Sequence, residues 1–108
     1  MRMLLKVSIP VDTGNAAAKS GALSSTVQKI LSEINPEAVY FAEDNGERTG
    51  YIFFDMKKSS DLPAIAEPWF LAFNAKITVR PAMTPADLAE ATPHIEKAAK
   101  TYGKGAGA

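Results

Sequence analysis

The stretch Thr49-Gly50-Tyr51-Ile52-Phe53-Phe54-Asp55-Met56 decides the fold of this chain. A strand with one solvated face alternates apolar and polar residues, whereas every residue from Tyr51 to Phe54 is apolar. As a strand, this segment has to be covered on both faces. Helices of the same chain can cover one face, and a second copy of the chain is the simplest cover for the other. The segment therefore predicts a sheet with helices on one side and a homodimer contact on the other.

A hairpin turn precedes this strand. Asn45-Gly46 is the strongest hairpin signal in the sequence, because a type I′ turn requires positive φ at both of its central residues. A two-residue turn here sets Tyr40 opposite Tyr51 and Glu43 opposite Arg48, and directly opposed residues share a face of the sheet. We expect one face to lie under the helices, with a Glu43–Arg48 pair at the turn. The apolar residues of that face are Val39, Phe41, Ile52, Phe54 and Met56.

The remaining segments supply two more strands and three helices. Apolar and polar residues alternate at 3–9 and at 75–81, which predicts two half-buried strands. Residues 12–15 are typical of a turn and a helix cap, and one apolar helical face then runs to residue 34, where Asn35-Pro36 ends it. A second helix is expected at 62–73 with a kink or break at Pro68. A third starts after Thr84 and could restart at Thr92-Pro93.

The resulting order is β-α-β-β-α-β-α, an α+β chain whose first six elements have the ferredoxin-like βαββαβ pattern, followed by an extra C-terminal helix. In that topology the four-stranded sheet is antiparallel, and its first and third strands are central. We expect a single domain at residues 1–102 and a flexible tail at 103–108.

Composition limits the chemistry. The 108 residues include 12 Lys+Arg and 12 Asp+Glu, so no basic excess favours nucleic acid as a partner. The absence of cysteine and the single histidine argue against disulfides, thiolate nucleophiles and a His/Cys metal site in one chain. We expect no metal and no other cofactor. No run of apolar residues is long enough for a membrane span, and no signal peptide is evident, which predicts a cytoplasmic protein.

The sheet face away from the helices carries the candidate ligand-binding residues. We expect Arg80 near Asp55 at one end of this face and Lys6 toward the other end. In one interpretation Lys6 or Arg80 binds a carboxylate or an enolate, while Tyr40 or Tyr51 donates hydrogen bonds. In the alternative, the face is only a dimer interface, in which the tyrosines pack and Arg80 pairs with Asp55. The candidates are therefore Lys6, Tyr40, Tyr51, Asp55 and Arg80.

Two further side chains have a structural interpretation. His94 is the only imidazole, but it lies near the start of a helical segment outside the sheet, where a solvent-facing role is expected. Trp69 matches the buried face of the second helix better than it matches a cofactor pocket.

Three segments resemble the dimeric α+β barrel superfamily and, more closely, a small uncharacterised bacterial family of the domain-of-unknown-function type. The segments are Gly50-Tyr51-Ile52-Phe53-Phe54-Asp55-Met56, Glu67-Pro68-Trp69-Phe70, and Val79-Arg80-Pro81-Ala82-Met83-Thr84-Pro85-Ala86-Asp87-Leu88. The resemblance implies two ferredoxin-like sheets packed face to face. The superfamily includes cofactor-free monooxygenases, isomerases, haem-degrading enzymes and ligand-sensing regulators, and this chain has no sequence-evident haem-ligand histidine in its strands.

The sequence thus predicts a homodimeric α+β barrel protein that binds a small anionic or aromatic metabolite on its sheet face. Whether it is an enzyme stays open at this point, and cofactor-independent oxygenation or isomerisation is the chemistry that would suit the site. The alternative is a non-enzymatic structural or interaction module whose sheet face serves only for dimer contacts.

Overall fold

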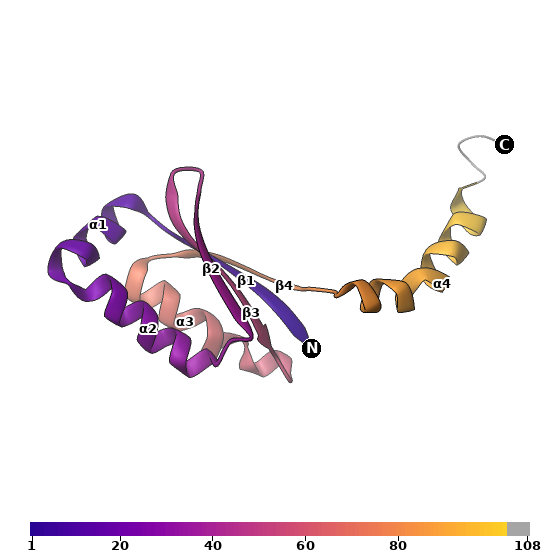
Figure 1. The fold of residues 1–108 in the computed structure, drawn as a ribbon, viewed down its shortest axis with the longest axis horizontal. Helices are drawn as coiled ribbons and strands as arrows, with labels where there is room; N and C mark the ends of the chain where they lie inside the picture. The colour runs from indigo at the N-terminus through magenta and orange to yellow at the C-terminus, as the bar shows by residue number, and fades with distance from the viewer. Residues whose placement is uncertain (104–108) are drawn as a thin grey trace.

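The computed structural model describes residues 1–103, so the expected tail lies outside the described residues apart from Gly103 (Figure 1). The elements are β1 (Arg2–Ile9), α1 (Val11–Ser20), α2 (Ala22–Ile34), β2 (Ala38–Asp44), β3 (Glu47–Asp55), the 3-10 turn η1 (Ser59–Asp61), α3 (Leu62–Phe73), β4 (Lys76–Pro81) and α4 (Pro85–Tyr102).

The strands form one antiparallel sheet in the order β2-β3-β1-β4, which confirms the predicted ferredoxin-like topology with β1 and β3 in the centre. The hairpin register is also confirmed, because Tyr40 pairs with Tyr51 across β2 and β3. Asn45 and Gly46 have φ values of 52° and 78°, as a type I′ turn requires.

The hydrophobic core lies between one face of the sheet and the helices α2 and α3, which lie together on that side (Figure 1). Alternate residues of β1 point into it, and Leu5 has no exposed surface. Ile52 and Phe54 of β3 are equally buried, and they meet Trp69 and Phe73 of α3. Within residues 1–103 no helix lies on the other face of the sheet, so these residues cover the central strand on one face only (Figure 1).

The first predicted helix is in fact two helices. It begins at Val11, where a turn and cap were expected, because Pro10 ends β1 and also fits the residue before a helix. Gly21 then adopts the left-handed conformation with φ 80°, and its N–H donates to Ala17 and Ala18 carbonyls. A left-handed glycine with this bonding ends one helix and lets the chain begin α2 in a new direction.

Of the kink or break predicted at Pro68, the break is wrong, because α3 is one helix from Leu62 to Phe73, and the kink stays a prediction. A proline at this position frees the carbonyl of Ala64, and Ala64 is exposed, so water can satisfy that oxygen.

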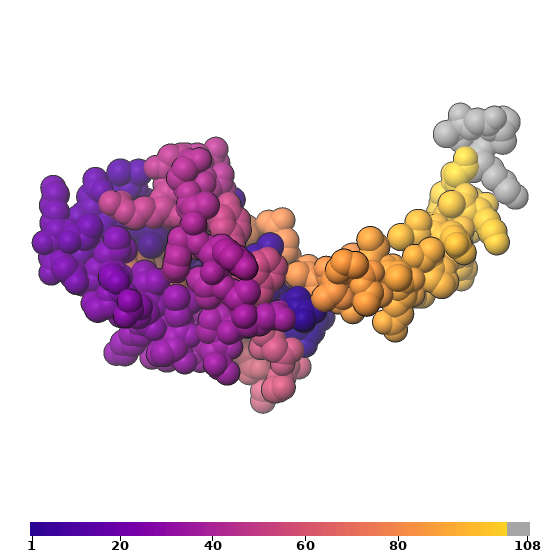
Figure 2. Space-filling model, in the orientation of Figure 1, coloured from indigo at the N-terminus to yellow at the C-terminus, as the bar shows by residue number. Residues whose placement is uncertain are grey.

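Helix α4 is likewise assigned as one helix through Pro93, so no restart occurs there, although its direction changes partway along (Figure 1). A capping box starts it: Asp87 N donates to Thr84 Oγ1 over 3.1 Å, and Thr84 N donates to Asp87 Oδ2 over 2.9 Å. The helix extends away from the sheet and buries none of its residues (Figure 2). No helix within residues 1–103 is long and apolar enough to cross a membrane.

Candidate functional site

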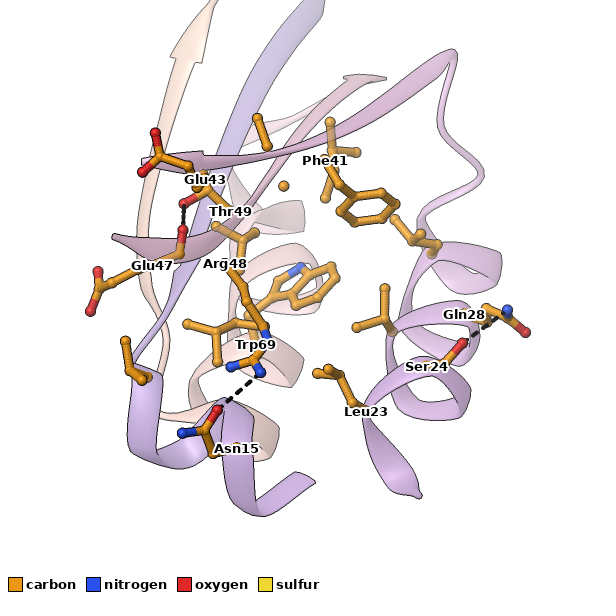
Figure 3. A pocket seen from close by; sticks show the side chains of 18 of the residues that line it. Asn15, Leu23, Ser24, Gln28, Phe41, Glu43, Glu47, Arg48, Thr49 and Trp69 are labelled. Atoms are coloured by element: carbon orange, nitrogen blue, oxygen red, sulfur yellow. Dashed lines mark hydrogen bonds between the residues drawn. The ribbon is translucent and has the colours of Figure 1, made fainter. Parts of the chain in front are cut away.

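A pocket of about 780 Å³ opens on the helix side of the sheet, between the β2–β3 hairpin and the helices α1 and α2 (Figure 3). Core residues of β1, β3 and α3 form its floor, and apolar residues of α2 form one wall. The sequence interpretation placed a ligand on the opposite sheet face, so none of its five candidate residues lines this pocket.

Phe41 forms the hairpin side of the pocket. It was expected to be covered by the helices, but its exposed fraction is 64%. β2 is the edge strand, and α2 does not close over it, so the space between them is the pocket itself. The Phe41 ring lies over its cross-strand partner Gly50, where an added Cβ would stand 3.4 Å from a ring carbon. The Phe41 ring therefore lies along β3 at a distance that leaves only ordinary contact room above Gly50.

Trp69 reaches the pocket from α3. Its side chain is 2% exposed, as the prediction of a core residue required, and its ring stacks on Phe73 with 6.3 Å between the centroids. Its indole Nε1 is buried without a hydrogen-bond partner among the described residues. A buried donor without an acceptor is uncommon in folded proteins, and this one belongs to a residue that lines a pocket large enough for a ligand.

Arg48 supplies the cation at the pocket rim. Its Nη2 donates to Oδ1 of Asn15 on α1 over 3.0 Å. This approach depends on Gly14, because an added Cβ there would stand 2.5 Å from Arg48 Nη1. Glu43 does lie opposite Arg48 across the hairpin, as predicted, but no ion pair joins their side chains among residues 1–103, and Glu43 Oε2 accepts from Gly46 N over 3.1 Å. The asparagine partner is favoured because α1 begins earlier than expected and carries Asn15 to the rim.

The pocket can therefore hold an apolar molecule and presents a guanidinium at its mouth, and Trp69 in its lining carries a buried donor without a partner among the described residues. No group of three or more His, Asp or Glu side chains in the described part of the chain could hold a metal ion. The sequence interpretation missed this site. A local signal is Gly14, whose missing side chain makes room for that of Arg48.

The five residues predicted from the sequence do share one face, the open face of the sheet. Lys6 pairs with Tyr51 across β1 and β3, and Tyr51 with Tyr40 across β3 and β2. Arg80 of β4 lies opposite Leu4, two residues along β1 from Lys6. Asp55 lies opposite Arg2 at the end of the sheet. The structure thus gathers these residues in the expected order, and ligand binding by them stays a prediction.

Ion pairs fix several side chains at the edges of the open face. Lys6 Nζ pairs with Asp44, and this hydrogen bond is the main reason that the pKa of Lys6 is raised. Asp55 Oδ1 lies 2.5 Å from the N-terminal amine of Met1 and Oδ2 lies 3.2 Å from Lys57 Nζ.

These two cations lower the pKa of Asp55, the N-terminal amine having the larger effect. The expected pairing of Asp55 with Arg80 is therefore replaced by closer partners, and Arg80 donates to Thr78 Oγ1 over 3.3 Å instead.

No family model matches the chain, and no curated protein matches it. Among solved structures it is similar to a protein from Deinococcus radiodurans described as a "putative antibiotic biosynthesis monooxygenase". The identity is 13%, the match covers 78% of this chain and 94% of that one, and the TM-score is 0.41. Those values are too low to transfer a function from that protein to this chain.

Proposed function

We propose that the protein binds a small, mostly apolar molecule carrying a hydrogen-bond acceptor, in the pocket between the β2–β3 hairpin and α1 and α2. The observation that carries this proposal is the unpartnered Nε1–H of Trp69 in the pocket wall. A buried donor left without an acceptor costs about 1–3 kcal/mol. A ligand that brings a carbonyl, ether or hydroxyl oxygen to this N–H recovers that free energy on binding.

The charges around the pocket favour a neutral ligand. Its rim holds Arg48 together with the carboxylates of Glu43 and Glu47, so the single guanidinium is outnumbered. Most of the remaining lining is apolar and includes Val27, and Leu23 of α2 and Phe41 of β2 lie on different sides of the opening (Figure 3). An aromatic molecule, one of the two classes expected from the sequence, suits such walls better than a small anion does.

The test compares two molecules of similar shape, benzophenone, which has a carbonyl acceptor, and diphenylmethane, which has none. Isothermal titration calorimetry measures the dissociation constant of each. Recovering about 1–3 kcal/mol predicts that benzophenone binds about 5- to 150-fold more tightly. Trp69→Phe removes the donor and should reduce this ratio to about one. Equal binding of the two molecules to the unmodified protein, or no binding of either, would contradict the proposal.

A homodimer is the second part of the proposal. Its support is the open face of the sheet, where the apolar side chains of Leu4, Tyr51 and Phe53 are only half-buried in one chain. In a dimer that covers this face, the five sequence-based candidates lie in or beside the interface. Cofactor-independent oxygenation or isomerisation stays a prediction from the resemblance, because the pocket geometry supports binding without singling out a reaction.

A further inference from the structure

Helix α4 carries an apolar stripe, no member of which is fully buried by the described residues 1–103. Its members recur at alternating spacings of three and four residues, which places them on one side of a helix. Leu88, Ile95 and Tyr102 are 48%, 57% and 80% exposed. The complete stripe is Leu88, Ala91, Ile95, Ala98 and Tyr102.

This helix needs a packing partner to be stable in water. Most helical stability in proteins comes from tertiary packing of an apolar face. Pro93 adds a penalty of about 3 kcal/mol relative to alanine in a helix interior. The capping box offsets only about 1 kcal/mol of this. A cover for the stripe therefore has to be found outside the contacts of one chain.

The chain's own sheet is not that cover, because the start of α4 is held so that the helix points away from it (Figures 1 and 2). Ala82 N donates to the Arg2 carbonyl over 3.1 Å and continues the β4–β1 ladder past the end of β4. The Arg2 guanidinium lies 3.9 Å from Asp87 in the first turn of α4 and also binds Glu37 over 2.7 and 2.8 Å. These contacts direct α4 outward.

We propose that α4 of one copy lies across the open sheet face of a second copy, and that the second copy's α4 returns the same contact. The dimensions are compatible, since the 18 residues of α4 have a contour length of about 27 Å, which its change of direction shortens (Figure 1), and the eight residues of the central strand β1 span about 26 Å. The middle of the open face is apolar at Leu4 and Phe53, which are cross-strand partners. Each sheet then has helices on both faces.

Charge complementarity supports the same arrangement. Lys76 and Arg80 stand on the β4 side of the open face, and neither has a carboxylate within 4.0 Å among residues 1–103. Glu90 and Glu96 are exposed on α4, each next to a member of the stripe. A reciprocal contact forms twice around one two-fold axis, so a single exchange covers both uncovered surfaces of both chains.

The chain has no cysteine, so single cysteines report the contact directly. Leu4→Cys marks the middle of the open face and Ile95→Cys marks the middle of the stripe. After mild oxidation, the proposal predicts a disulfide-linked dimer when the two variants are mixed, and none from either variant alone. Lys97→Cys, on the opposite side of α4, is the matched control and should not cross-link to Leu4→Cys.

Each other outcome overturns the proposal. Cross-linking of Leu4→Cys with itself would show that the two open faces stack on each other. Cross-linking of Ile95→Cys with itself would show that two α4 helices pair. Absence of a cross-link in every mixture would show that α4 does not reach a second copy. A companion measurement is the mass by light scattering: Ile95→Glu should lower it from twice 11.5 kDa toward 11.5 kDa, whereas Lys97→Glu should leave it unchanged.

Discussion

Replacing Phe41 by alanine distinguishes ligand binding in the pocket from ligand binding on the open sheet face. Its neighbour Tyr40 provides a matched control. The two residues are adjacent on β2 and are 64% and 67% exposed, yet they point to opposite faces of the sheet. Phe41 lines the pocket, whereas Tyr40 is one of the residues predicted from the sequence to bind a ligand.

The expected magnitudes follow from exposure. Fully burying a phenylalanine is worth about 1.5–3 kcal/mol, and only about a third of Phe41 is buried, so Phe41→Ala should lower the free energy of unfolding by about 0.5–1 kcal/mol. A ligand that covers half of the exposed ring would bury roughly 65 Å² of apolar surface, worth about 1.5 kcal/mol. The dissociation constant for benzophenone should therefore rise about tenfold.

Calorimetry with benzophenone on both variants is the assay, and urea unfolding checks that each variant is folded. Tyr40→Ala should leave the dissociation constant within about twofold of that of the unmodified protein. If Tyr40→Ala weakened binding and Phe41→Ala did not, the ligand would lie on the open face and the assignment of the pocket would be refuted.

Three further predictions concern the fold and the assembly. Position 46 has a φ of 78°, a left-handed conformation that costs a residue with a Cβ about 1–2 kcal/mol, so Gly46→Ala should lower the free energy of unfolding by that amount. A urea titration measures it, and an unchanged free energy would refute the type I′ turn. Arg2 lowers the pKa of Glu37, so the stability from this pair is present above the unfolded-state pKa of about 4.3 and is lost as pH falls from there through the lower folded-state pKa. Glu37→Gln should flatten that loss in unfolding measured from about pH 6 to pH 3, and an unchanged acid limb would contradict it. Thr84→Ala removes a helix cap from each α4, and two caps are worth about 2 kcal/mol, so the dimer dissociation constant should rise about 30-fold. Analytical ultracentrifugation measures this constant, and an unchanged value would contradict the exchange of α4 between copies.

The sheet could be predicted from the sequence because its signals are local. The alternation along β1 and the Asn45-Gly46 turn fix which residues share a face, and the register across the hairpin follows from a two-residue turn. The grouping of Lys6, Tyr51 and their neighbours on one face follows from the same rules.

The pocket could not be predicted in this way, because it depends on where α1 and α2 lie relative to the hairpin. Helical periodicity continued past Gly21, so the change of direction between α1 and α2 was not visible in the pattern of apolar residues. The Arg48–Asn15 contact joins residues 33 positions apart and depends on the absence of a side chain at Gly14. Phe41 alternates correctly for the helix side, but strand alternation cannot say whether a helix reaches the edge strand.

The most direct measurement of the central claim is the indole N–H resonance in a ¹H–¹⁵N spectrum, because Trp69 is the only tryptophan of the chain. On saturation with benzophenone, the account predicts that the single indole proton moves downfield and exchanges more slowly with solvent, as it gains an acceptor. An indole resonance that stays in place while backbone amides of the open face, such as those of Lys6 and Tyr51, change their shifts would contradict it.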